Sequence, residues 1–158
     1  FYLSPNMLAA GDLRIEVNWT MEGDADGNLW LFTGTRIYPG LNPADWGNCD
    51  TNACVERGDY HFGPEIFYMK SGNIGTHPVI VTKNQSLSDY EITEIGATVT
   101  IIKQDGTQIK FTPPIFGTGS WWYPLDLVWQ GGDTQYSIVE RKLICTGTPP
   151  STSSCTPY

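Results

Sequence analysis

Short apolar runs separated by glycine, proline, asparagine or aspartate recur along this chain, and they constrain its fold more than any other feature. In residues 13–19, the side chains of Leu13, Ile15, Val17 and Trp19 fall at every second position, as in a strand with one buried face. No long stretch has helical periodicity, so the sequence predicts an all-β, antiparallel β-sandwich of jelly-roll type. Comparable runs, rich in β-branched and aromatic residues, occupy 28–32, 77–82, 96–103, 107–112 and 134–144.

Two connections interrupt this strand pattern in different ways. Asp105-Gly106 lies between two runs and predicts a two-residue hairpin turn in which both residues have positive φ. Residues 34–64 are long and rich in Gly, Asn and Asp, so we expect a loop insertion that leaves the sandwich, with at most one helical turn near 42–47.

Length and charge limit the domain count and the partners. The 158 residues, 40% of them hydrophobic, suit a single domain over 1–158. A net charge of −8 argues against a nucleic-acid partner. No apolar stretch approaches the roughly 20 residues that a membrane span needs. Because the chain starts at Phe1 rather than Met, we expect a mature, secreted form.

Four cysteines also indicate a secreted protein. We expect disulfides between Cys49 and Cys54 and between Cys145 and Cys155, although four cysteines permit three pairings. Zinc is the alternative, but neither pair has C-x-x-C spacing. Disulfides imply an oxidising, extracellular location. The second bridge would also order the tail, residues 145–158, whose composition resembles a linker.

Two possible glycosylation sequons, at Asn18 and Asn84, are compatible with secretion. About one such match is expected by chance in a chain with this much Asn, Ser and Thr, so they carry little weight.

An oxygen-rich stretch opens the run at 28–32. Asp24, Asp26 and Asn28 alternate there beside two glycines, and such hard oxygens are ligands for calcium. The closing glutamate of an EF-hand is missing, and a solvated Asx turn is the alternative. Further ligands would come from the insertion, which offers Asp45, Asp50, Glu56 and Asp59.

An aromatic stretch at 119–129 suggests a platform for a carbohydrate or a protein partner, formed by Trp121, Trp122 and Tyr123. Adjacent strand residues point to opposite faces, so both tryptophans cannot belong to one core. Either one is exposed as the platform, or one is core and the other packs under a loop.

The N-terminal segment, residues 1–10, concentrates apolar side chains whose burial is worth about 1.5–3 kcal/mol each. The segment forms either an ordinary edge strand or a donor strand that completes the sheet of a neighbouring subunit. The partner-binding residues of such a donor are Phe1, Tyr2, Leu3, Met7 and Leu8.

Residues 24–106 carry four motifs in a recognisable order, DADGNLWLF, GDYHFGPEIFYM, GNIGTHPVIVTKNQ and GATVTIIKQDG. Together they resemble the YfaP-like group of secreted β-sandwich domains. An extra residue after Asp26, the pair His77-Pro78 and the cysteine-bearing insertion depart from the pattern of that group. The resemblance implies a sandwich with a surface role, similar in layout to calcium-dependent accessory domains, and no enzymatic mechanism.

A second resemblance, carried by the N-terminal FYLSPNMLAAG, is to secreted sandwich subunits that build extracellular fibres and tubules by strand donation. It implies a homo-oligomer or filament.

Signals for catalysis are weak. No nucleophile-elbow or H-E-x-x-H motif is present. Asp59 with Glu65, or Glu56, would supply a glycosidase pair on paper, as acidic chains commonly do. The sequence therefore predicts a non-enzymatic, secreted structural protein that self-assembles with calcium, and the alternative is a monomeric carbohydrate-binding or adhesive module.

Overall fold

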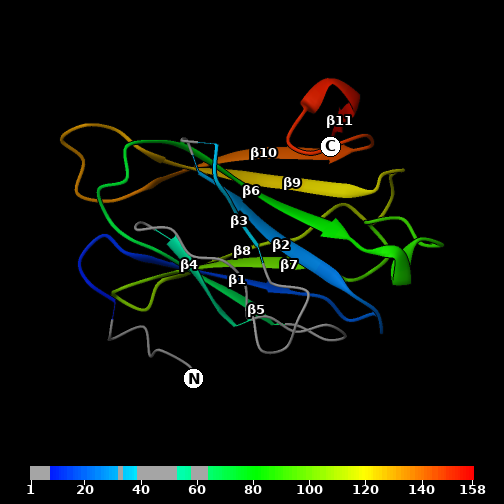
Figure 1. The fold of residues 1–158 in the computed structure, drawn as a ribbon, viewed down its shortest axis with the longest axis horizontal. Helices are drawn as coiled ribbons and strands as arrows, with labels where there is room; N and C mark the ends of the chain where they lie inside the picture. The colour runs from blue at the N-terminus through cyan, green and yellow to red at the C-terminus, as the bar shows by residue number, and fades with distance from the viewer. Residues whose placement is uncertain (1–7, 32–33, 39–52, 58–63) are drawn as a thin grey trace.

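The chain folds into two antiparallel β-sheets that pack face to face as a β-sandwich (Figure 1). This computed structural model describes residues 8–31, 34–38, 53–57 and 64–158, with the side chains of 54, 56 and 57 left out. The five-stranded sheet has the order β4 (Ala53–Arg57), β5 (Glu65–Met69), β1 (Leu13–Asn18), β7 (Thr98–Lys103) and β8 (Gln108–Phe111). The six-stranded sheet has the order β11 (Cys155–Pro157), β10 (Ser137–Cys145), β9 (Trp121–Trp129), β6 (Gly75–Lys83), β2 (Ala25–Trp30) and β3 (Arg36–Ile37).

Helical structure in the described residues is limited to two 3-10 turns, η2 (Gln85–Leu87) and η3 (Thr152–Ser154). No helix in these ranges is long and apolar enough to cross a membrane.

The core lies between the sheets and follows the alternation seen in the sequence. Leu13, Ile15 and Val17 are all buried, and Ile15 lies opposite Phe67 of β5 and Ile101 of β7. The β-sandwich prediction and the strand predicted at 13–19 are therefore confirmed.

Two strands lacked a clear alternating signal because they are buried on both faces. Eight of the nine residues of β9 are buried, and β5 contains a buried Ile66 beside a buried Phe67. An irregularity in the β6–β9 pairing, between Val79 and Val81, also interrupts the alternation. The alternation of apolar and polar residues is therefore absent from the sequences of these two strands.

The predicted hairpin between β7 and β8 is present, but its turn differs from the prediction. Only Gly106 has a positive φ, of 83°, and the Lys103 N–H bonds to the carbonyl of Thr107 at 3.0 Å. The loop thus has three residues rather than two, and the Asp105 side chain accepts a hydrogen bond from the Thr107 N–H at 2.9 Å. The turn therefore needs positive φ at one residue rather than two, and the hydrogen bond to the Asp105 side chain stabilises it.

The predicted insertion at 34–64 is only partly an excursion from the sandwich. β3 pairs with β2 at Leu29 and Trp30, and β4 pairs with β5. The insertion therefore supplies one edge strand to each sheet. The helical turn expected at 42–47 lies outside the described residues.

The C-terminal tail is fastened to the six-stranded sheet. Cys145 and Cys155 form the predicted disulfide, β11 pairs with β10, and the Trp122 indole N–H donates to the Tyr158 hydroxyl at 2.8 Å. The bridge predicted between Cys49 and Cys54 is not described, because Cys49 lies outside the described residues and only the backbone of Cys54 is given.

Replacing both tail cysteines, Cys145→Ala with Cys155→Ala, should lower the free energy of unfolding by about 2–3 kcal/mol, because the bridge closes a short loop in the unfolded chain. The loop has a sequence separation of 10. Urea denaturation followed by tryptophan fluorescence measures the change. An unchanged midpoint would show that strand pairing alone holds the tail.

Candidate metal centre

Three carboxylates from the two sheets converge at one end of the sandwich. Asp24 immediately precedes β2, Asp26 is the second residue of β2, and Glu65 is the first residue of β5. One oxygen from each lies within 4.8 Å of the others. The cluster is therefore a junction between sheets rather than a feature of one loop.

Gly27 allows the two strands to approach this closely. A Cβ atom at Gly27 would lie 2.6 Å from Cε2 of Phe67 and 2.7 Å from Cγ2 of Val17, closer than carbon atoms pack. With no side chain in the way, the Gly27 N–H donates to Glu65 Oε2 at 2.7 Å.

Glu65 is fully buried, with 0% of its surface exposed. Burial of a carboxylate is costly unless hydrogen bonds compensate, and the bond from Gly27 is charge-assisted. Sequence reasoning missed Glu65 as a ligand. The available signal was its spacing, since Glu65, Phe67 and Met69 share the core-facing side of β5.

Asp24 is fixed by the turn that follows β6. Its backbone N–H donates to Ser86 Oγ at 2.8 Å, and one of its carboxylate oxygens accepts from Asn84 Nδ2 at 2.6 Å. Asn84 also caps η2 by accepting from the Ser86 N–H. The amide of this predicted sequon therefore has two structural contacts.

Burial raises the pKa of the Asp26 carboxyl above its ordinary 3.8, and the nearby Arg36 opposes that rise. The burial effect is the larger of the two. Asp26 is thus a carboxylate whose negative charge the fold disfavours, and a cation beside it would offset this cost.

Asn28, the third predicted ligand in this stretch, is engaged on the outer face of the sheet. Its Oδ1 accepts from Arg36 Nε at 2.6 Å, and its Nδ2 donates to Thr82 Oγ1 at 3.0 Å. An ion would therefore compete with Arg36 for this oxygen. Among the other predicted ligands, Glu56 contributes only backbone to the described structure, and Asp45, Asp50 and Asp59 lie outside it.

The spacing of the three carboxylates suits calcium. Calcium binds oxygen at about 2.3–2.6 Å, so two ligands on one ion lie up to about 5 Å apart. Oxygens that all lie within 4.8 Å of one another can therefore reach a single ion of this size.

The predicted aromatic platform is buried. Trp121, Trp122 and Tyr123 are 1%, 0% and 4% exposed. Trp122 belongs to the main core, and Trp121 lies in a second cluster on the outer face, where its indole N–H reaches the Thr146 carbonyl at 3.3 Å. This arrangement matches the alternative in which one tryptophan is core and the other packs under a loop.

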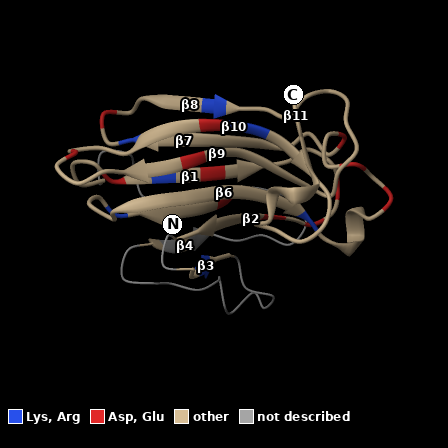
Figure 2. Cartoon of the chain, turned by 90° about the horizontal axis from the view of Figure 1, so that it is seen from above, with Lys and Arg blue, Asp and Glu red and all other residues tan. Residues whose placement is uncertain are grey.

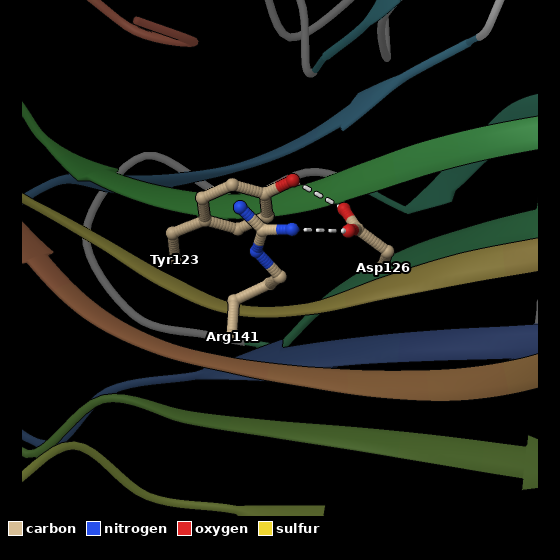
Figure 3. A network of polar contacts seen from close by, with 3 residues as sticks. All are labelled: Tyr123, Asp126 and Arg141. Atoms are coloured by element: carbon tan, nitrogen blue, oxygen red, sulfur yellow. Dashed lines mark hydrogen bonds and ion pairs between the residues drawn. The ribbon is translucent and has the colours of Figure 1, made fainter. Parts of the chain in front are cut away.

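Tyr123 takes part in a polar network beside that second cluster (Figure 3). Its hydroxyl donates to Asp126, and Arg141 Nη1 lies 3.4 Å from the other oxygen of Asp126. Burial, followed by the contact with Asp126, raises the pKa of Tyr123. The Tyr123 hydroxyl therefore stays protonated and can donate its hydrogen bond. Together with Arg141 it provides partners for the buried Asp126 carboxylate.

The remaining predicted residues have local roles where they are described. Leu8 is only 3% exposed and so packs within its own chain, whereas Phe1, Tyr2, Leu3 and Met7 lie outside the described residues. Asn18, the other sequon, donates from Nδ2 to Glu16 Oε1 at 2.7 Å.

Comparison with known proteins gives no match to a family model, to a curated protein or to a solved structure.

In buffer containing a chelator, Asp26→Asn should raise the melting temperature at pH 7. The folded-state pKa of Asp26 lies above the unfolded value, so stability is lost as pH rises through the folded pKa. The gain from Asn should therefore shrink as pH falls toward 3.8. Thermal unfolding followed by circular dichroism at several pH values measures it.

Asp105→Asn is the matched control, because hydrogen bonds from Thr107 lower the pKa of this exposed carboxyl. It should give no gain at pH 7. An equal gain in both variants would contradict a specific burial cost at Asp26.

Proposed function

We propose that this chain is a non-enzymatic, extracellular structural protein that binds calcium at Asp24, Asp26 and Glu65 and self-associates through its sheets. The observation that carries the proposal is the convergence of three carboxylates from two sheets within 4.8 Å. A cation there would neutralise the cluster and tie β2 to β5.

Calcium binding would strengthen the fold where burial disfavours an ionised carboxylate. The fold disfavours ionised Asp26 and fully buries Glu65. Ligands that bind only the folded state stabilise it by mass action. Extracellular calcium would then act as a permanent part of the sandwich rather than as a switch.

Self-association is supported by the edge of the five-stranded sheet, as far as the described residues define it. β8 is the last strand of that sheet and has four residues. An added strand would satisfy the outward backbone groups of such an edge. Donation by the N-terminal segment, as in the fibre and tubule subunits that the chain resembles, concerns residues 1–7, because Leu8 is already packed.

An extracellular setting is supported by the Cys145–Cys155 disulfide, because such bonds persist in oxidising compartments. The YfaP-like resemblance adds support of the same kind.

A structural rather than catalytic role also suits His77. It is fully buried, its Nε2 lies 2.9 Å from the Asn73 carbonyl, and its ring meets Tyr136 edge-on at 6.2 Å. Burial lowers its pKa. A buried imidazole that is occupied in this way serves packing, and His61 lies outside the described residues.

Saturating calcium should raise the melting temperature relative to chelator by about 5–10 °C. At a hundred times Kd the gain is about 2.7 kcal/mol, and each kcal/mol shifts a domain of this size by about 2–4 °C. Glu65→Gln combined with Asp26→Asn should abolish the shift. Differential scanning calorimetry with calcium, magnesium and chelator measures it.

Glu140→Gln is the control, since this exposed glutamate pairs with Lys142 away from the cluster. It should keep the full calcium shift. A wild-type melting curve that is identical in calcium and in chelator would refute the calcium proposal.

A second candidate function, polysaccharide binding, is favoured by a hollow of about 280 Å³ on the outer face of the six-stranded sheet. Trp30, Arg36, Asn28 and Thr82 line it together with the tail loop at Thr148 and Pro149. Aromatic faces beside hydrogen-bonding side chains are suited to sugar rings.

Arg36 gives this hollow a fixed shape. Its guanidinium carbon lies 5.8 Å from the Trp30 ring and 4.5 Å from the Tyr38 ring, while Nε is held by Asn28. An adhesive or carbohydrate role would fall to this hollow rather than to the buried Trp121 segment.

Trp30→Ala should reduce retention on a polysaccharide array by about two- to tenfold, because stacking on an aromatic ring contributes about 0.5–1.5 kcal/mol. Tyr90→Ala, which removes another exposed ring (43% exposed), should leave retention unchanged. Equal retention for both variants, or none for the wild type, would exclude this second function.

A further inference from the structure

The hollow beside Trp30 has two walls that come from distant parts of the chain. One wall is the outer face of β2, β3 and β6, and the other is the loop between β10 and β11, at Thr148 and Pro149. Its volume of about 280 Å³ is that of about nine water molecules. This space is comparable with the non-hydrogen atoms of a single sugar ring and its hydroxyl groups.

The loop wall is held in place by bonds within the tail. The tail disulfide closes the loop, and the Thr146 N–H donates to the Ser154 carbonyl at 3.0 Å. Inside the loop, the Ser151 N–H donates to the Thr148 carbonyl at 3.1 Å. The wall is therefore formed before any ligand arrives, which lowers the entropy lost on binding.

Charges at the hollow favour a ligand with no charge. Arg36 is the only charged residue among the described residues that line it. Arg36 lies near enough to Asp26 to oppose the rise in the pKa of that carboxyl, so its charge already faces an acid. An acidic sugar would bring a second negative group to this place, on a chain of net charge −8. An amino sugar would place its cation beside Arg36.

The tail adds no charge to this balance. Residues 144–158 contain no Lys, Arg, Asp or Glu, and the chain around β11 accordingly has no blue or red segment in Figure 2. A ligand against this wall therefore meets backbone, hydroxyl and apolar groups alone.

Hydrogen-bonding groups at the hollow favour a ligand that is rich in hydroxyls. The Trp30 indole N–H is buried and meets no acceptor among the described residues. A buried donor without an acceptor is costly, and a bound group commonly explains one. On the other wall, Thr148 is exposed, and its hydroxyl can donate or accept. A sugar hydroxyl has both capacities as well.

We propose that this hollow binds one neutral sugar residue of a polysaccharide, held between Trp30 and the tail loop at Thr148. The inference rests on the second candidate function, polysaccharide binding, and names the class of sugar and the contacts that select it.

Affinity electrophoresis of the whole chain tests the class of sugar. The gels contain a glucan, a mannan, a galactan, a xylan or polygalacturonate. At least one of the four neutral polymers should retard the protein, and polygalacturonate should not, because its carboxylates meet an acidic chain.

Two conservative variants test the contacts. Thr148→Val removes a hydroxyl and keeps the shape of the side chain, and Trp30→Phe keeps an aromatic ring and removes the N–H. Each should weaken binding of the neutral polymer by about two- to tenfold, as expected for one hydrogen bond. Thr152→Val is the matched control, because it makes the same change at an exposed position of the same loop, outside the lining of the hollow. It should bind as the wild type does.

The remaining outcomes separate this inference from the function on which it rests. Retardation by polygalacturonate that equals retardation by the neutral polymers overturns the neutral class and leaves polysaccharide binding in place. Neutral polymers that retard Thr148→Val and Trp30→Phe as strongly as the wild type overturn the proposed contacts. A wild type that no polymer retards overturns both the inference and the second candidate function.

Discussion

The convergence of the two sheets at Gly27 is the constraint on which the candidate site depends. β3 pairs with β2 only at Leu29 and Trp30, so within the described residues no strand pairs with the earlier part of β2 on that side. There the Glu65 carboxylate takes the place of a strand by accepting the Gly27 N–H. An acid from one sheet thus completes the hydrogen bonding of the other, and the missing side chain at Gly27 makes this possible.

The same geometry that satisfies the backbone concentrates negative charge. Glu65 reaches the beginning of β2, beside Asp24 and Asp26. Among the causes that shift the pKa of Asp26, only Arg36 opposes the effect of burial. The proposed divalent cation would resolve this conflict without loss of the hydrogen bond from Gly27, because a carboxylate oxygen has more than one lone pair. Calcium concentration and sheet packing would then be linked through one small region.

Features that depend on residues close together in the sequence were predicted, whereas contacts between distant segments were missed. Alternation identified the strand from Leu13 and the acids Asp24 and Asp26, and close spacing identified the Cys145–Cys155 bridge. Glu65 was not recognised as a partner of those acids, because its position depends on the approach of β5 to β2. Strands that are buried on both faces show no alternation of apolar and polar residues. The burial of Trp121 under the tail likewise produces no pattern in the sequence.

The tail explains why an acidic chain can have a hydrophobic cluster on the outer face of its six-stranded sheet. By closing over Trp121 and Cys145, it extends hydrophobic packing beyond the space between the sheets. The tail contains no charged side chain, so this packing adds no ionised side chain to an acidic chain. The tail therefore covers the outer face without adding to the repulsion among carboxylates that the proposed cation would relieve.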